Sequence, residues 1–195
     1  MPVYFDSDRI GDTLVSSVKY IITAPQGFFA DMPPADAYRN SLTFLTIVLV
    51  VLAIGLSLMS GLVLLPVIFP VAIVLGLITT WMWAWYLGWA CRVFCKTQLS
   101  TINAFQICAY GSVPLVFSWL PIIGMLSSLW NLYLNWQGLV SHARVGGGSA
   151  LLIILGPLIV MGISMAILAV LAFKLMTDMG VDPTQLIDSG DVELF

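Results

Sequence analysis

The chain has 195 residues, of which 60% are hydrophobic and only 9% are charged. Soluble domains carry about 25% charged residues, so this composition excludes an ordinary globular protein and indicates a chain that lies largely in lipid. The formal net charge of −3 excludes nucleic acid as a partner, because no basic patch is present to displace the counterions of the phosphates.

The N-terminal arm, residues 1–40, begins with an amphipathic pattern between Ser7 and Thr23. Apolar residues recur there at spacings of three and four, at Ile10, Leu14, Val18 and Ile21 or Ile22. Ser7 or Asp8 can cap the start of such a helix, and Pro25 is expected to end it. An amphipathic helix can lie in the membrane interface, dock on a partner or pack on its own transmembrane bundle, and the pattern leaves these alternatives open.

Three long segments contain no Asp, Glu, Lys or Arg, namely residues 40–91, 97–143 and 145–173. A helix needs about 20 apolar residues to cross the hydrocarbon layer, so these segments have room for two crossings, two crossings and one crossing. We therefore predict an all-α integral membrane fold with five transmembrane helices, preceded by the short amphipathic helix.

Proline and glycine residues divide these segments into spans. The predicted spans are residues 42–59, 67–90, 103–118, 121–140 and 150–173, with turns at residues 60–61 and 146–148. The third span is short and contains Pro114, which frees a backbone carbonyl and bends the helix. A bilayer tolerates such a carbonyl only where a neighbour bonds it, so we expect the third helix to be the most enclosed one.

The basic residues predict how the chain crosses the membrane. With five crossings, all but one of the seven fall on one side, namely Arg9, Lys19, Arg39, Arg92, Lys96 and Arg144, while Lys174 falls on the other. Excess Lys and Arg marks the cytoplasmic side. We therefore expect a multi-pass protein of the cell (inner) membrane. It has a cytosolic arm at residues 1–40, a five-helix domain at residues 41–174 and an acidic extracytoplasmic tail at residues 175–195. The arm lacks the apolar core of a secretory signal peptide.

The third and fourth helices hold most of the polar residues that the membrane would enclose. They form stripes at helical spacing: Asn103, Gln106 and Tyr110; Ser127, Asn131 and Asn135; and Tyr133 with Gln137. An amide without a hydrogen-bond partner is costly in hydrocarbon, so the stripes are expected to face each other or another protein. We interpret them as groups that bond helix to helix. The alternatives are a polar cavity for a substrate or a lipid headgroup and a contact with a second membrane protein.

The spans offer no candidate for catalysis or for cofactor binding. They contain no carboxylate and no Lys, and the chain has one histidine, so proton relays and acid–base pairs lack their groups. One metal hypothesis remains, because Cys91, Cys95 and His142 are all expected at the cytosolic face and could hold zinc together with water. Without a fourth close ligand, free cysteines and an interfacial histidine are the simpler interpretation. We predict no metal, no cofactor and no enzymatic activity.

Several short motifs resemble the membrane domain of the Yip (Ypt-interacting protein) family. They are Tyr110-Gly111-Ser112-Val113-Pro114, Leu120-Pro121-Ile122-Ile123-Gly124, Leu129-Trp130-Asn131-Leu132-Tyr133-Leu134, Gly138-Leu139, His142 and, upstream, Pro25-Gln26-Gly27-Phe28-Phe29. The resemblance covers about residues 10–173. It implies five spans and a cytosolic N-terminus, in agreement with the charge pattern. Eukaryotic relatives contact Rab-type GTPases largely through a longer cytosolic region. The short arm of this chain looks prokaryotic, so Rab binding is not carried over.

Two functions follow from this reading. The first is a non-enzymatic membrane scaffold or accessory subunit, which contacts the lipid bilayer and associates with other membrane proteins or with itself. The second is a conduit for a lipid or a small molecule, through a polar cavity between the third and fourth helices. Four residues of the two stripes would line that cavity, namely Asn131, Asn135, Gln106 and Tyr110.

Overall fold

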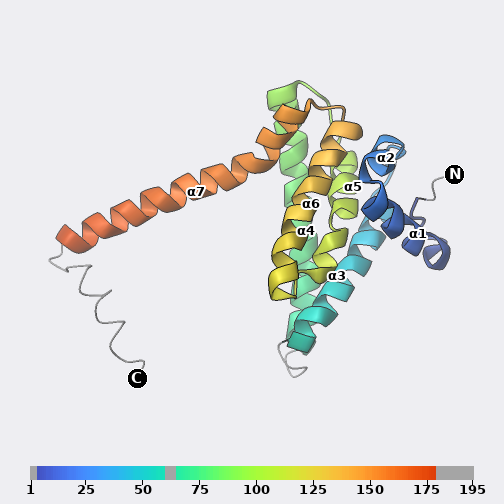
Figure 1. Ribbon diagram of the computed structural model, residues 1–195, viewed down its shortest axis with the longest axis horizontal. Coiled ribbons are helices and arrows are strands. Elements are labelled where there is room, and N and C mark those ends of the chain that lie inside the picture. Colours follow the sequence, from blue (N-terminus) through green and yellow to red (C-terminus); the bar gives the residue numbers. More distant parts are fainter. Residues whose placement is uncertain (1–3, 60–64, 179–195) are drawn as a thin grey trace. The chain divides into compact units, whose positions relative to one another are not determined.

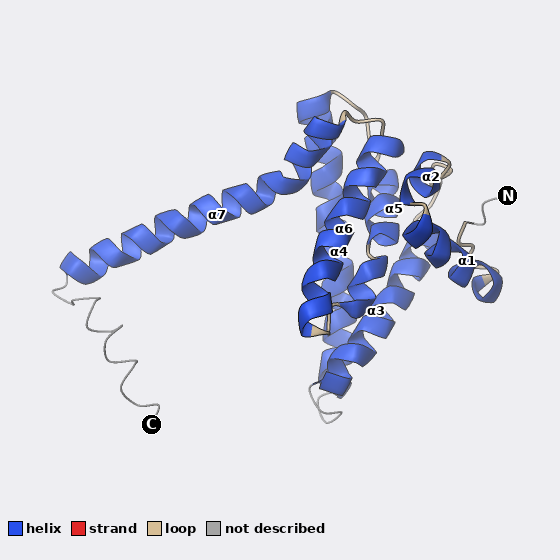
Figure 2. Cartoon of the chain, in the orientation of Figure 1, coloured by secondary structure: helices blue, strands red, loops and turns tan. Residues whose placement is uncertain are grey.

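The computed structural model describes residues 4–59 and 65–178, and every regular element in those two ranges is a helix (Figure 2). In chain order the elements are α1 (Ile10–Thr23), α2 (Pro25–Ala30), α3 (Arg39–Met59), α4 (Leu65–Cys95), α5 (Thr101–Gly111), the 3₁₀ helix η2 (Val113–Phe117), α6 (Pro121–Ser141) and α7 (Gly147–Asp178). The predicted all-α class is confirmed for the described residues. The turn predicted at residues 60–61 and most of the predicted tail, from residue 179 onward, lie outside them.

Three of the described helices are long and apolar enough to cross a membrane, namely Arg39–Met59, Pro66–Cys95 and Gly147–Leu171. They coincide with the first, second and fifth predicted spans. The third predicted span corresponds to the shorter apolar segment Thr101–Phe117, and the fourth corresponds to α6.

Within the unit formed by Met1–Ile154, α4 packs on α3 and on α5, and α6 packs on α5 (Figure 1). α5 contacts the other three helices, and every residue from Ala104 to Gly111 is buried. The enclosed position predicted for the third span is therefore confirmed.

The third span is two helices and not one. Pro114 has no N–H to continue the α-helical ladder, so the chain changes to i→i+3 bonds at this point. The N–H of Ser112 bonds the carbonyl of Ala109, and the N–H of Leu115 bonds the carbonyl of Ser112 at 2.9 Å. The proline thus ends α5 at Gly111 and begins η2, where a single bent helix was predicted.

The arm contains a second helix that the sequence reading did not predict. Pro25 begins α2, because the first helical position needs no N–H and suits the fixed φ of proline. α1 packs on α2, and α2 packs on α6. Of the alternatives for the amphipathic helix, packing on the chain itself is the one observed. The predicted cap at Ser7 or Asp8 is wrong, since α1 begins after Arg9 with no side-chain cap.

The second unit, Leu155–Phe195, is described as far as Asp178 and consists there of the continuation of α7. α7 begins within the first unit, at Gly147, so the turn predicted at residues 146–148 is largely wrong. The indole Nε1 of Trp136 donates to the carbonyl of Gly147 at 3.0 Å and so ties the first turn of α7 to α6.

Candidate functional site

The polar stripe of α5 faces the N-terminal arm of the same chain. The Oδ1 of Asn103 accepts a hydrogen bond from the backbone N–H of Ala35 at 2.8 Å. The Nε2 of Gln106 donates to the carbonyl of Pro33 at 3.2 Å. Both amides therefore hold the loop between α2 and α3. The sequence pattern favoured the α6 stripe or another protein as the partner of these two amides. In the structure their partners are instead backbone groups of the arm.

Tyr110, the third member of this stripe, joins the same contact through its ring. Its centroid lies 5.3 Å from that of Phe28 and 4.8 Å from that of Phe44, both in edge-on geometry. Phe28 also meets the rings of Tyr4 and Tyr20 at 5.3 and 5.6 Å. Phe28 and Phe44 are fully buried. The arm is thus part of the hydrophobic core and not a loose extension of it.

Asn131 provides the hydrogen bond between α6 and α5. Its Nδ2 donates to the carbonyl of Gly111 at 2.8 Å. In a continuous α-helix that carbonyl would accept from the N–H of Leu115, but the 3₁₀ turn has redirected this N–H to Ser112. Asn131 therefore satisfies the backbone group released where α5 ends, which is the partner that a proline-interrupted membrane helix needs.

The other members of the α6 stripe bond within their own helix. The Oγ of Ser127 donates to the carbonyl of Ile123 at 2.8 Å, and the Nδ2 of Asn135 donates to the carbonyl of Asn131 at 2.8 Å. Asn135 packs close against Gly111, where an added Cβ would meet its amide nitrogen at 3.0 Å. The stripe therefore lines the contact with α5 at Asn131 and Asn135.

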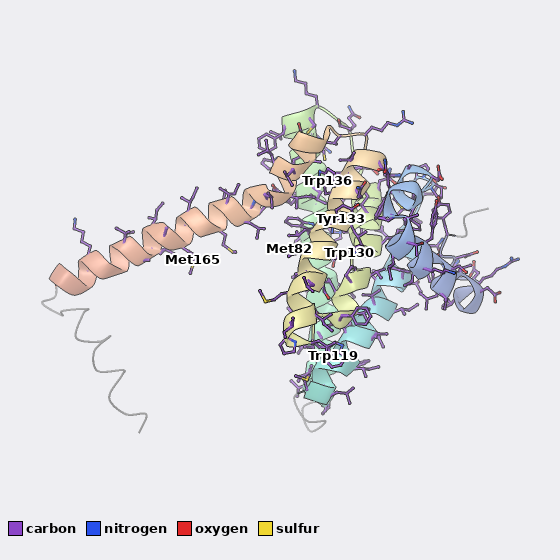
Figure 3. The ribbon with its side chains drawn as sticks, viewed as in Figure 1. Met82, Trp119, Trp130, Tyr133, Trp136 and Met165 are labelled. Carbon is purple, nitrogen blue, oxygen red and sulfur yellow. The ribbon has the colours of Figure 1, made fainter. Side chains whose placement is uncertain are left out.

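A second row of α6 is aromatic. Trp130, Tyr133 and Trp136 follow one another along the helix (Figure 3), with ring centroids 5.7 and 6.0 Å apart. The hydroxyl of Tyr133 accepts from the Nε2 of Gln137 at 3.0 Å. Gln137 in turn accepts from the Oγ of Ser141 at 3.5 Å. The amide of Gln137 is therefore bonded within α6, whereas the sequence pattern predicted that it would face another helix or another protein.

Four buried side-chain atoms have no hydrogen-bond partner among the described residues. They are the hydroxyl oxygens of Tyr4 and Ser7 and the amide oxygens of Gln106 and Asn135. A buried polar atom without a partner costs about 1–3 kcal/mol, so each of these atoms would gain from a further hydrogen bond. Three of the four lie in the arm or in the part of α5 that contacts it.

A pocket of about 520 Å³ lies between the arm, the start of α3 and α5. Gln106 and Tyr110 line it from α5, and Tyr4 and Phe5 line it from the arm. Its polar groups also include carboxylates of the arm and the guanidinium of Arg39. None of the α6 amides lines this pocket.

The charges around the pocket are mostly negative. Asp6, Asp8 and Asp36 line it, against the single cation of Arg39. Arg39 is paired with Asp8 at 2.5 Å, and both side chains are about two-thirds exposed, so the pair contributes little to stability. Burial, together with the nearby charge of Asp31, raises the pKa of Tyr4 to about 12, and its hydroxyl therefore stays a hydrogen-bond donor at neutral pH.

The hypothetical metal ligands do not form a cluster. Within residues 4–59 and 65–178 no group of three or more His, Cys, Asp or Glu side chains is placed to hold a metal ion, and Cys91 is buried. His142 instead lies against the end of α2. Burial lowers the pKa of His142, while hydrogen bonds to the backbone of Met32 and Phe29 act in the opposite direction.

Comparison with known proteins identifies the family. The family model of the Yip1 domain matches residues 19–168, which include part of α1 and most of α7. The chain belongs to the Yip1 domain family. No curated protein and no solved structure gave a match. The family and the apolar helices together make it a membrane protein, whose helices contact the lipid bilayer.

In this Yip1 domain, the motif residues that suggested the family cluster where α5 meets α6. Gly111 contributes the carbonyl bonded by Asn131, and Pro114 causes the change to η2. Gly138 lies against Ile107, and a Cβ added at Gly138 would overlap that side chain. The motif therefore describes a close helix contact with one interhelical hydrogen bond.

Sequence reasoning missed the pocket between the arm and α5. No sequence motif includes Asp6, Asp36 or Arg39. These residues come close to Gln106 only because the arm folds back onto α5. The hydrogen bond from Gln106 to Pro33 joins residues 73 positions apart. The one available signal was Phe28-Phe29 beside Pro25, which suggested the family but not the docking of the arm.

Proposed function

We propose that this Yip1 domain is a non-enzymatic membrane scaffold or accessory subunit that associates with other membrane proteins. The observation that carries the proposal is that amide side chains of α5 and α6 form hydrogen bonds within the chain. Asn103, Gln106 and Asn131 each donate or accept a bond within the chain, to the arm or to the end of α5. Groups committed to holding a fold together are not lining a path for a substrate, so the molecule acts through its surfaces.

The proposal includes the five-span topology and the division into arm, membrane domain and tail. α5 with η2 and α6 would form the third and fourth crossings as a pair of short helices. The support is the charge pattern, which leaves Lys174 as the one basic residue away from the cytoplasmic side.

Extraction in a mild detergent, followed by native mass spectrometry of the intact assembly, tests the scaffold function. We expect a stoichiometric second membrane protein or a second copy of the chain. A parallel extraction after cross-linking in intact cells preserves weak assemblies. A bare monomer in both preparations would contradict the proposal.

One observation favours the conduit as a second candidate. The Oδ1 of Asn135 is buried in the contact between α5 and α6 and has no partner among the described residues. A small polar solute passing there could bond it. Liposomes with the purified protein would then show flux that Asn135→Leu abolishes and that Ser128→Ala, at an exposed position of α6, leaves unchanged. Equal flux in all three preparations would reject the conduit.

A further inference from the structure

The pocket between the arm and α5 lies at the end of a membrane span. Arg39 and Ser41 line it, and they belong to the first turn of α3, one of the helices long enough to cross a bilayer. Gln106 and Tyr110 close its inner side from the enclosed helix α5. Charged residues at one end of a span mark the headgroup region, so the pocket reaches from that region towards the apolar core.

The electrostatics of this pocket favour a cation. Three carboxylates line it against one guanidinium, and that guanidinium is already paired with Asp8. Asp6 and Asp36 form no ion pair in the part of the chain that the structure describes. Two further carboxylates therefore remain to attract positive charge.

Gln106 adds a requirement for a hydrogen-bond donor. Its side chain is only 6% exposed, and its Nε2 is engaged with Pro33. Its Oε1 has no partner among the described residues. A primary ammonium offers three N–H donors and a positive charge, so it can satisfy this oxygen and the carboxylates together. A trimethylated ammonium has the same charge and no donor.

The pocket also offers donors to an anion next to that ammonium. The hydroxyl of Tyr4 is buried and has no partner within the described ranges, and the guanidinium of Arg39 carries five N–H donors, of which two bond Asp8. We propose that this pocket binds a primary ammonium linked to a phosphate ester, as in the headgroup of an aminophospholipid. Its volume of about 520 Å³ is within the usual range for a ligand of this size. This inference does not depend on the scaffold function.

Native mass spectrometry of the full-length protein tests the proposal. The purified chain is exchanged into mixed micelles that contain equal amounts of phosphatidylethanolamine and phosphatidylcholine of the same acyl chains. These two lipids carry the same charge, and they differ in the three methyl groups that replace the N–H donors of the ammonium. We expect the ethanolamine lipid to be retained about tenfold better, the effect of one charge-assisted hydrogen bond.

Two variants test whether the lipid preference comes from the carboxylates of the pocket or from the negative charge of the arm as a whole. Asp6→Asn with Asp36→Asn removes the two carboxylates, and Asn at position 6 keeps the oxygen that bonds the N–H of Asp8. This double variant should retain the two lipids equally. Asp12→Asn, an exposed residue of α1 that does not line the pocket, should keep the preference. If the double variant does not fold, the single variant Asp36→Asn, at an exposed position, is used in its place. We then expect a smaller loss of the preference for the ethanolamine lipid.

Soluble glycerophosphoethanolamine distinguishes the two sources of this headgroup. Displacement of the lipid by millimolar amounts of the soluble compound supports binding of the headgroup alone, and retention against it supports recognition of the whole lipid. Equal retention of the two lipids by the wild-type chain would overturn the proposal, as would an undiminished preference in the folded Asp6, Asp36 variant.

Discussion

Asn131 shows how one side chain compensates for a break in a helix. The carbonyl of Gly111 loses its helical partner where η2 begins, and the amide of Asn131 replaces it at 2.8 Å. The need for such a partner followed from Pro114 in the sequence, since hydrocarbon offers no water to a free carbonyl. The sequence did not show which side chain is that partner, because Asn131 and Asn135 lie on the same face of α6 and carry the same amide group.

Replacing Asn131 by Leu should therefore destabilise the protein. The leucine keeps the volume but leaves the Gly111 carbonyl without a partner, at a cost of about 1–3 kcal/mol. The free energy of unfolding in mixed micelles, measured by titration with a denaturing detergent, checks this. Ser128→Ala removes only a bond within α6 and should change that free energy by less than about 0.5 kcal/mol. Equal stability of both variants would contradict the role of Asn131.

His142 should make the docking of the arm sensitive to acid. Burial lowers its pKa in the folded protein, so the folded state favours the neutral ring and the unfolded chain binds the proton more readily. The resulting stability is present above the ordinary histidine pKa of about 6.5 and is lost as the pH falls below it.

Thermal unfolding between pH 7.5 and pH 5 measures this effect. The chain has one histidine, so His142→Gln should flatten the dependence of the midpoint on pH in this interval. A variant whose midpoint falls as steeply as that of the wild-type chain would assign the acid sensitivity to other groups.

At the scale of the elements, apolar length predicted the long helices well. α3, α4 and α7 follow the predicted spans with ends that differ by several residues, because the length of an apolar stretch does not fix where a helix ends. The positions of α5 and α6 also followed from Pro114 and Pro121. α2 was missed, since proline was read as the end of one helix and not as the start of the next.

The docking of the arm was beyond local reasoning for a different reason. Asn103, Gln106 and Tyr110 have the spacing of one helix face, but spacing does not say what that face meets. The partners are Pro33, Ala35 and Phe28. Two of these offer only backbone groups, which any residue carries. The two hydrogen bonds to Pro33 and Ala35 therefore leave no pattern in the sequence.

Phe28 should be the main apolar anchor of α2. It is fully buried and contacts the rings of Tyr4, Tyr20, Phe29 and Tyr110. Phe28→Ala should cost about 3–5 kcal/mol and release the arm.

Limited proteolysis of the folded protein in detergent detects this release as faster cleavage in residues 31–38. Val15→Ala, at a position of α1 that is 72% exposed, should leave the cleavage rate unchanged. An unchanged rate in the Phe28 variant would show that the arm is held by other contacts.

For the whole molecule, the charge pattern makes a prediction about sidedness. In a variant without the native cysteines, Lys174→Cys should react with a membrane-impermeant maleimide in intact cells. Lys19→Cys, exposed on α1, should react only after the membrane is permeabilised. Labelling of both positions under the same condition would exclude an odd number of crossings and the proposed topology with it.

The amides that bond the arm also set the time at which the arm can dock during synthesis of the chain. Asn103 and Gln106 lie 68 and 73 positions after the backbone groups that they bond. At a synthesis rate of about 5–20 residues per second, the arm waits roughly 4–15 s for these partners to emerge from the ribosome. During that interval Phe28 can already meet Tyr4, Tyr20 and Phe29, but it is without Tyr110. The nascent chain thus exposes the aromatic segment of α2 well before α5, against which this segment packs, has been synthesised.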